Sequence, residues 1–309
     1  SALLSAADLE VKGGRKYDLE RLVATGGMGV GYQARDVNCD RTVAIKVLLS
    51  DEEHEKENRS RFVSEARITS GLEHPNIIPI HELGKDSTGN VFYSMKFIRG
   101  MTLGDVLNDI RKGRRDVIDQ YPLGRLLTIF QKTCDAVAFA HAHGVVHRDL
   151  KPGNIMIGNY GEVLVLDWGL ARKVSAGPEP EPATPAAAPK IELREEDGGR
   201  IIDTIRVDTS AAGLKTISGT VLGPPGFMAP EQIRKDGVID ARTDIYALGA
   251  ILYSILTLAS PVREKKIPDL LRLILSGDIV PPAAYNPWGP GQPANLPHCP
   301  GRQIPAVLS

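Results

Sequence analysis

The residues of this chain best suited to chemistry lie in one run from His147 to Asn154, followed by Asp167. Asp149 can accept a proton from a hydroxyl group, and Lys151 can neutralise a phosphoryl group during its transfer. Asn154 and Asp167 carry hard oxygen atoms, which are the ligands that Mg²⁺ prefers. The run therefore predicts a site for metal-dependent phosphoryl transfer to a hydroxyl.

Two other interpretations of this run are open at this point. A short piece such as His147-Arg148-Asp149 also occurs in charged surface turns. Small-molecule phosphotransferases share a shorter pattern of a histidine, an aspartate and an asparagine. Motifs elsewhere in the chain have to decide between these alternatives.

A glycine-rich turn and a lysine in an apolar strand lie near the start of the chain. Gly26, Gly27 and Gly29 leave room for backbone amides to approach phosphates, although glycine clusters also occur in ordinary hairpin turns. Lys46 follows three apolar residues, and a lysine in such surroundings is costly unless it is paired. The apolar alternation also allows an edge-strand lysine that points to solvent. The glycine turn upstream favours a lysine that binds phosphate.

The expected secondary structure changes from strands to helices along the chain. A charged periodic segment at residues 55–72 predicts a helix, and the pattern from residue 103 onward is mostly helical. β-Branched and alternating residues predict five strands, at residues 17–24, 30–35, 42–49, 77–83 and 91–98. A helix is expected at residues 123–143, with apolar residues on its buried face at positions 126, 127, 130, 134, 137 and 138.

Two segments have compositions that do not favour a packed fold. Residues 178–189 are rich in proline and are followed by an acidic stretch, so residues 174–215 are expected to form a mobile insertion. A further helix is expected at residues 267–276. Residues 278–309 are again rich in proline.

The composition argues against several functional classes. A net charge of -1 with 24% charged residues gives no sign of a nucleic-acid partner. The three cysteines are far apart in the sequence, which indicates a reducing compartment rather than a disulfide framework. No segment has the roughly 18 apolar residues of a membrane span, and no export signal is visible. These features predict a cytoplasmic protein, or the cytoplasmic part of a longer membrane-anchored one.

Two further motifs connect the chain to a known family. Met228-Ala229-Pro230-Glu231 and the segment from Asp244 to Gly249 follow the first run at spacings that small-molecule phosphotransferases lack. With the run from His147 to Asn154 and with Asp167-Trp168-Gly169, they resemble the motifs of a bacterial, eukaryotic-like (Hanks-type) serine/threonine protein kinase. Lys151, two residues after the aspartate, is the signature of the serine/threonine-specific members.

The resemblance implies an α+β fold, the two-lobed protein kinase fold. A five-stranded N-lobe with one helix is expected at residues 17–98, after an N-terminal extension at residues 1–16. The C-lobe, at residues 99–309, is expected to be mainly helical. It looks truncated, because members of the family continue with more helices than residues 278–309 provide.

The resemblance also implies a nucleotide site for ATP. Lys46, paired with Glu65 on the following helix, would position the α- and β-phosphates. Met95 would lie at the back of the adenine pocket, Phe97 in the hinge that reads the base, and Met156 beneath the adenine.

The same resemblance assigns the remaining chemistry to the motifs described first. Asn154 and Asp167 would hold Mg²⁺ or Mn²⁺, and Asp149 would orient the hydroxyl and accept its proton. Lys151 would stabilise the transferred charge. Asp244 would brace the backbone of the catalytic loop.

Regulation and partners follow from the resemblance as well. Arg148, beside the catalytic acid, would bind the phosphate of a phosphorylated activation loop. Thr216 and Ser218 are the expected sites of autophosphorylation, for which two copies of the chain would associate. The substrates would be proteins that present serine or threonine.

Departures from the family pattern leave a second function open. Ala24 replaces a glycine, Gly31 stands where a valine usually covers the adenine, and Pro224 replaces a threonine that contacts the catalytic aspartate and lysine. The arginine that usually pairs with the counterpart of Glu231 is also missing from the sequence. The alternative is therefore a pseudokinase that acts as a nucleotide-binding or scaffolding module.

Overall fold

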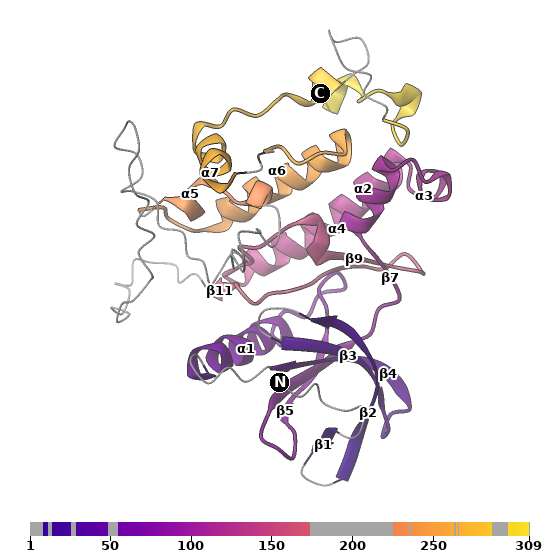
Figure 1. Cartoon of the computed structure of the whole chain (residues 1–309), viewed down its shortest axis with the longest axis vertical. Helices are drawn as coiled ribbons and strands as arrows, with labels where there is room; N and C mark the ends of the chain where they lie inside the picture. Colours follow the sequence, from indigo (N-terminus) through magenta and orange to yellow (C-terminus); the bar gives the residue numbers. More distant parts are fainter. Residues whose placement is uncertain are drawn as a thin grey trace. The chain divides into compact units, whose positions relative to one another are not determined.

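The computed structural model describes most of the 309-residue chain, in nine segments. These segments are residues 9–11, 14–25, 29–48, 55–173, 225–234, 236–262, 264, 266–285 and 296–308. Within them the chain forms two compact units (Figure 1). The first unit consists of residues 1–106, 131–143 and 152–172, and the second of residues 107–130, 144–151 and 173–309.

The first unit is built on a six-stranded antiparallel sheet with the strand order β1-β2-β3-β4-β6-β5. All five strands predicted from the sequence are present, and the short β1 is added at one edge. The strands are β1 (Leu9–Val11), β2 (Gly14–Thr25), β3 (Gly29–Asp36), β4 (Arg41–Leu48), β5 (Ile80–Lys85) and β6 (Val91–Lys96). Strand β5 begins later than predicted, because Ile77 and Ile78 pair with Val165 and Pro79 has no N–H to donate.

Helix α1 (Glu55–Ser70) packs on one face of this sheet, against β4, β5 and β6. Alternation along β4 sends Val43, Ile45 and Val47 into a core on the opposite face, which also includes Phe92. On the α1 side a second core joins Leu48, Phe62, Ala66, Val91 and Tyr93. Because side chains alternate between faces, Lys46 lies on the side that α1 covers.

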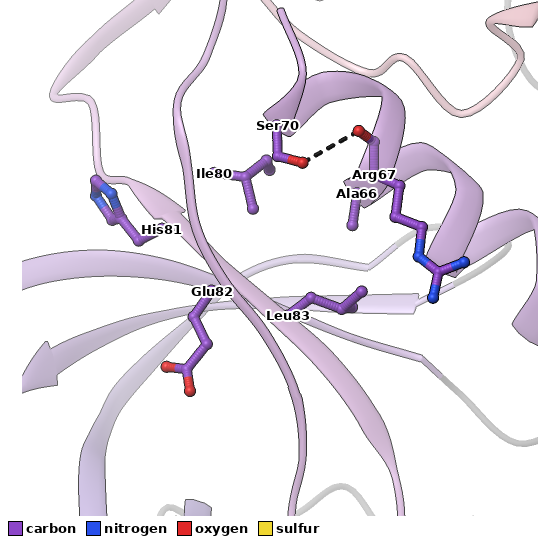
Figure 2. A pocket seen from close by; sticks show the side chains of 7 residues that line it. All are labelled: Ala66, Arg67, Ser70, Ile80, His81, Glu82 and Leu83. Atoms are coloured by element: carbon purple, nitrogen blue, oxygen red, sulfur yellow. Dashed lines mark hydrogen bonds between the residues drawn. The ribbon is translucent and has the colours of Figure 1, made fainter. Parts of the chain in front are cut away.

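A small cavity of about 150 Å³ lies between α1 and β5. Figure 2 shows its seven lining residues, where the Ser70 hydroxyl donates to the backbone carbonyl of Arg67 on the last turn of α1. None of the site residues predicted from the sequence lines it. The cavity therefore belongs to the joint between helix and sheet rather than to the predicted site.

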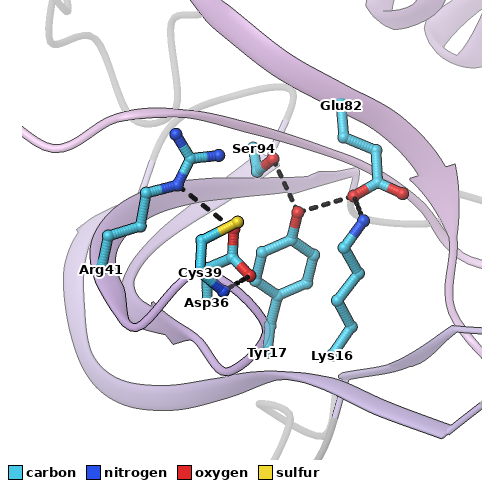
Figure 3. Close-up of polar contacts among 7 residues, drawn as sticks. All are labelled: Lys16, Tyr17, Asp36, Cys39, Arg41, Glu82 and Ser94. Atoms are coloured by element: carbon cyan, nitrogen blue, oxygen red, sulfur yellow. Dashed lines mark hydrogen bonds and ion pairs between the residues drawn. The ribbon is translucent and has the colours of Figure 1, made fainter.

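A polar cluster ties β2 to β5 and β6 (Figure 3). The buried hydroxyl of Tyr17 donates to Glu82 at 2.6 Å and lies 3.0 Å from the hydroxyl of Ser94. Lys16 pairs with the same carboxylate. Burial and the hydrogen bond to Glu82 raise the pKa of Tyr17 above its ordinary value, so this hydroxyl remains a neutral donor.

A three-stranded sheet of order β10-β9-β7 completes the first unit, with β7 (Gly100–Thr102), β9 (Ile155–Gly158) and β10 (Val163–Val165). The 3₁₀ helix η1 (Pro152–Asn154) leads directly into β9. Val165 at the end of β10 is held by a hydrogen bond from its backbone N–H to the carbonyl of Asn76. This hairpin therefore fixes both the residue before β9 and the residues after β10.

Helix α4 (Leu123–Ala142) corrects one detail of the sequence analysis. Two predicted positions, 126 and 137, are buried, whereas Ala138 is exposed. The other buried positions are Leu123, Ile129, Thr133, Ala136 and Ala140. The buried stripe includes a threonine and small residues, which an apolar count ranks below the larger side chains.

The second unit is mainly helical. Helix α2 (Leu103–Arg111) leads into it, and it contains α3 (Arg115–Gln120), α5 (Pro230–Ile233), α6 (Ala241–Thr257) and α7 (Ile267–Ser276). Short strands β8 (Val145–Val146) and β11 (Arg172–Lys173) flank residues 147–171 in sequence. Helix α6 is capped at its start by Asp240, whose side chain accepts from the amide of Arg242. Helix α7 matches its predicted residues and is capped at its end by Gly277 in the left-handed conformation.

Part of the proline-rich end packs into the second unit. The carbonyl of His298 accepts from the amide of Leu123 at 2.8 Å, and its Nε2 lies 2.7 Å from the carbonyl of Ile255. Burial lowers the pKa of His298, and its Nδ1 has no partner within the described part of the chain. His298 therefore joins the start of α4, through its backbone carbonyl, to the end of α6, through its neutral imidazole.

Candidate active site

Lys46 and Glu65 form the expected ion pair in the first unit. The Nζ atom of Lys46 lies 2.8 Å from Oε1 and 3.0 Å from Oε2 of Glu65. The glutamate side chain is only 4% exposed and the lysine 22%. The solvent-facing alternative for Lys46 is therefore wrong, because β4 is a central strand whose α1-facing side carries this lysine.

Two aromatic rings and one hydroxyl complete the surroundings of this pair. The ammonium group of Lys46 lies 5.8 Å from the ring of Phe62 and 5.6 Å from the ring of Tyr93. The hydroxyl of Tyr93 donates to Oε1 of Glu65 at 2.7 Å. Burial, and then the nearby charge of Glu65, raise the pKa of Tyr93 well above its ordinary value. Tyr93 was not singled out from the sequence.

The hairpin of β9 and β10 brings Asn154 and Asp167 to the same end of the small sheet. Ile155 pairs with Val165, and the amide of Leu166 donates to the carbonyl of Asn154 at 2.8 Å. Asp167 then adopts a left-handed backbone with a φ of 60°. Asparagine and aspartate tolerate this region better than most residues do. The backbone hydrogen bonds between β9 and β10 therefore hold both predicted metal ligands, Asn154 before β9 and Asp167 after β10.

Gly169 brings Asp167 close to the ion pair. A methyl group added to Gly169 would lie 3.1 Å from Oε2 of Glu65 and 3.3 Å from Oδ1 of Asp167. Both carboxylates therefore converge on one face of this glycine. Trp168 is buried beside it, which anchors the turn between them.

The donor set of Asn154 and Asp167 fits Mg²⁺ or Mn²⁺. One amide oxygen and one carboxylate are hard ligands, and Mg²⁺ is usually held by one or two protein groups together with water and substrate phosphates. Among the described residues there is no group of three or more His, Cys, Asp or Glu side chains that could hold a metal ion. A metal at this place would therefore depend on water and phosphate oxygens for the rest of its coordination.

The glycine-rich segment is described only in part. Gly26 and Gly27 lie outside the described residues. Gly29 begins β3, and a side chain there would place its Cβ atom 2.5 Å from the carbonyl oxygen of Val47. This position therefore requires glycine because two backbones approach closely.

Ala24 and Gly31, the two departures from the family pattern near the glycine turn, lie opposite each other on neighbouring strands. Ala24 on β2 is the register partner of Gly31 on β3. A methyl group on Gly31 would lie 3.7 Å from the Cβ atom of Ala24, which is ordinary contact. Ala24 therefore leaves room for a Cβ atom at position 31. Pro224, the third substitution, lies outside the described residues.

The predicted adenine-contacting residues lie at three places in the first unit. Met95 is on β6, half-buried against the core under α1. Phe97 is half-buried in the connection between β6 and β7. Met156 is on β9, between its partners Leu164 and Thr102. No described contact joins these three side chains, and their contact with a base stays a prediction.

The catalytic loop in the second unit is held by its backbone. The amides of His147 and Arg148 each donate to the buried Asp244 on α6, both at 2.8 Å. Arg148 has a left-handed φ of 71°. Its carbonyl accepts from the side chain of Gln232 on α5 at 2.8 Å. The bracing role expected for Asp244 thus has a structural basis, and Gln232 adds a clamp that the sequence analysis missed.

Asp149 and Lys151 pair with each other at the end of this braced backbone. Nζ of Lys151 lies 2.8 Å from Oδ2 of Asp149. The side chain of Lys151 is 38% exposed and that of Asp149 is 26% exposed. The two groups therefore lie where a solvent-borne hydroxyl can approach them.

Glu231 has a hydroxyl partner in the second unit. The hydroxyl of Thr243 donates to Oε1 of Glu231 at 2.7 Å, which connects α5 to α6. Glu231 is the glutamate whose counterpart in the family usually pairs with an arginine. The predicted phosphorylation sites Thr216 and Ser218 lie outside the described residues.

A profile of the protein kinase domain matches residues 17–280. The chain belongs to the protein kinase family. Members of this family in general use ATP with a divalent metal ion. The two-lobed α+β fold class predicted for this kinase domain is confirmed by the match and by the sheet and helices described above.

Curated bacterial relatives resemble this kinase domain over most of its length. Serine/threonine-protein kinase PknD of Chlamydia caviae is 38% identical over 255 residues, covering 82% of this chain and 25% of the relative. PknD of Chlamydia trachomatis serovar D is 36% identical over 300 residues, covering 96% and 28%. PknD of Chlamydia pneumoniae is 33% identical over 298 residues, covering 95% and 28%. The kinase domain thus spans about a quarter of the length of these relatives.

Two residues near the predicted site had weak signals in the sequence. Tyr93 is a hydroxyl-bearing residue in a mostly buried strand, two positions before Met95. Gln232 follows the Met228–Glu231 motif directly. Each would have been found only by asking which polar group in a buried segment needs a partner.

None of the described helices of this kinase domain is long and apolar enough to cross a membrane.

Proposed function

We propose that this chain is an ATP-dependent protein kinase that transfers the γ-phosphoryl group to serine and threonine hydroxyls of proteins. The buried pair of Lys46 and Glu65 is the observation that carries the proposal. A charged pair taken out of water gives little net stability, so its retention is better explained by a role in binding. An ammonium group beside a metal-binding hairpin suits the phosphates of a nucleotide.

In the first unit, the residues would bind and orient the nucleotide. Lys46, held by Glu65, would contact the α- and β-phosphates, and Gly29 would keep the strand backbone close to them. Asn154 and Asp167 would hold Mg²⁺ or Mn²⁺. When bound, the metal ion would neutralise phosphate charge during transfer.

In the second unit, the residues would act on the acceptor hydroxyl. Asp149 would orient the hydroxyl and accept its proton, and Lys151 would stabilise the charge on the transferred group. Lys151 is the residue expected in serine/threonine-specific kinases. The names of the PknD relatives support the same specificity.

The proposal is tested by incubating the chain with radiolabelled ATP, Mg²⁺ and a generic basic protein. We expect label on serine and threonine, and we expect Asp149→Asn to lower the rate by roughly 10²–10⁴-fold, the usual contribution of a general base. Asp119→Asn, an exposed carboxylate on α3, is the matched control and should transfer at the wild-type rate. Binding of ATP without any transfer would point to the pseudokinase instead.

We also propose that the kinase is regulated by autophosphorylation at Thr216 and Ser218, with one copy of the chain acting on another. Arg148 would bind the resulting phosphate, which carries charge and acceptor oxygens suited to a guanidinium. Phosphosite mapping after incubation with ATP and Mg²⁺ should find these residues, and Asp149→Asn should leave them unmodified. Modification at neither residue would end this proposal. A cytoplasmic location and the identity of the protein substrates stay predictions.

A further inference from the structure

Tyr93 occupies a special place beside the phosphate-binding lysine. On β6 it is the direct cross-strand partner of Lys46 on β4, and on its other side it faces Leu83 on β5. Its side chain is only 3% exposed and belongs to the core under α1. Apolar neighbours would be equally well served by a phenylalanine ring, so packing alone does not explain the hydroxyl.

The hydroxyl of Tyr93 has one described partner, the carboxylate of Glu65. It donates to Oε1 at 2.7 Å, and the same oxygen lies 2.8 Å from Nζ of Lys46. Donation to a buried carboxylate gives a hydrogen bond stronger than one between neutral groups. Tyr93 thus connects α1 to the sheet through the catalytic ion pair, in addition to its ring contact with Phe62.

The other carboxylate oxygen of Glu65 is confined from the opposite side. Gly169 lies so close that an added methyl group would be 3.1 Å from Oε2. The carboxylate is therefore located between a fixed donor on Oε1 and a backbone surface near Oε2. Both of its oxygens remain within hydrogen-bond distance of Lys46.

Tyr93 can act only as a donor in this arrangement. Burial, followed by the charge of Glu65 and the hydrogen bond to it, raises the pKa of the phenol well above its ordinary value. Asp167 adds a smaller contribution in the same direction. The hydroxyl therefore stays protonated at neutral pH.

We propose that Tyr93 is a positioning residue for phosphoryl transfer, whose hydroxyl fixes the Glu65 carboxylate in the orientation that holds Lys46 for the nucleotide phosphates. This role rests on the proposed kinase function and deepens it. Tyr93 itself touches neither nucleotide nor substrate. It acts through Glu65, and it makes the position of α1 against the sheet part of nucleotide binding.

The test is the Tyr93→Phe variant, which keeps the ring and removes the donor. Hydrogen bonds to charged groups are worth enough that we expect KM for ATP to rise about tenfold, with kcat falling less than about threefold. A structural defect would instead lower the fraction of active protein, which reduces apparent kcat and leaves KM unchanged. An unchanged KM would overturn the proposal.

Tyr17→Phe is the matched control, because the chain offers a second buried tyrosine in the same sheet that donates to a glutamate. Its partners are Glu82 and Ser94, which lie outside the ion pair. KM for ATP should change less than about twofold in this variant. An equal rise of KM in both variants would mean that any lost hydroxyl in the sheet loosens nucleotide binding.

A double-mutant cycle with Glu65→Ala, which leaves no acceptor for the Tyr93 hydroxyl, identifies the path of the effect. If Tyr93 acts through the carboxylate, Tyr93→Phe should change KM by less than about twofold once Glu65 is replaced. A full tenfold effect in that background would overturn the role. The equilibrium affinity for ATP is measured for all four proteins as well. A wild type that binds ATP without transferring phosphate would end the kinase proposal and still test Tyr93, whereas one that binds no ATP would end both.

Discussion

The two units hold their reactive residues in different ways. In the first unit the side chains hold one another: Glu65 and Tyr93 are buried, and both Tyr93 and the partly buried Lys46 are hydrogen-bonded to Glu65. In the second unit Asp244 and Gln232 hold the backbone of the catalytic loop. The side chains of Asp149 and Lys151 are more exposed than those of Lys46 and Glu65.

This difference fits the two tasks proposed for the units. Phosphates of a nucleotide have a fixed shape, so a rigid charged group prepared in advance binds them with little reorganisation. Protein substrates differ in sequence, and a hydroxyl has to reach Asp149 from solvent. A rigid backbone with accessible side chains allows the loop to position a hydroxyl and to exchange one protein substrate for another. Side-chain defects should therefore affect nucleotide binding, whereas backbone defects should affect transfer alone.

The largest effect should come from breaking the ion pair with Lys46→Met. Removing one partner of a buried pair leaves the other charge uncompensated, which costs about 3 kcal/mol of unfolding free energy. ATP affinity and activity should also be lost. Thermal unfolding and ATP titration measure both.

Adding Glu65→Gln to Lys46→Met separates the loss of stability from the loss of activity. Stability should return to near the wild-type value, because neither remaining group is charged, while activity should not return. Recovery of activity would show that the pair is not needed for phosphate binding, and the contrast between the two units would lose its basis.

The next effect should come from Asp244→Asn in the second unit. The side chain of asparagine has only one acceptor oxygen for the two backbone N–H groups of His147 and Arg148. The loop should therefore lose about 2 kcal/mol of local stability. We expect activity to fall about tenfold through misplacement of Asp149, with ATP affinity unchanged within about twofold. Steady-state kinetics and ATP titration check this.

Asp240→Asn is the control on the same helix. Asparagine caps a helix as well as aspartate does, so both activity and stability should stay near wild type. A loss of ATP affinity in Asp244→Asn would mean that the backbone clamp of the second unit also serves nucleotide binding.

A smaller effect is expected from Gly169→Ala. The new methyl group meets carboxylate oxygens of Glu65 and Asp167 at 3.1 and 3.3 Å, so both must move by a few tenths of an ångström. Activity should fall about threefold to tenfold, with a higher Mg²⁺ requirement. Rates measured across a Mg²⁺ titration test this. Gly124→Ala on α4 meets nothing within 4 Å and should behave as wild type.

The smallest effect concerns pH and His298. Its folded pKa lies below the ordinary value of 6.5, so the unfolded chain binds a proton that the folded chain does not. Stability should therefore fall as pH drops through 6.5 and level off below the folded pKa. His298→Gln keeps a donor for the carbonyl of Ile255 and should lose less stability than wild type between about pH 7.5 and pH 5. Equal losses in the two proteins would contradict this, and thermal unfolding measures them.

Much of the fold followed from local patterns. Strand alternation and helix periodicity depend on neighbours in the chain, and they predicted five strands of the large sheet and the residues of α7 correctly. The start of β5 and the buried face of α4 were predicted less well. Pairing of Ile77 with Val165 and burial of Thr133 depend on contacts between distant segments, which no local pattern contains.

The sequence by itself determined the family and the set of chemical groups, because the motif from His147 to Asn154 and Asp167 specifies residue types at fixed spacing. Tertiary structure alone decided how these groups are held. The register of β4 and β6 sets Tyr93 opposite Lys46, and the register of β2 and β3 sets Ala24 opposite Gly31. Strand register depends on turns, bulges and the packing of whole faces, so partners across a sheet emerge only when the chain has folded.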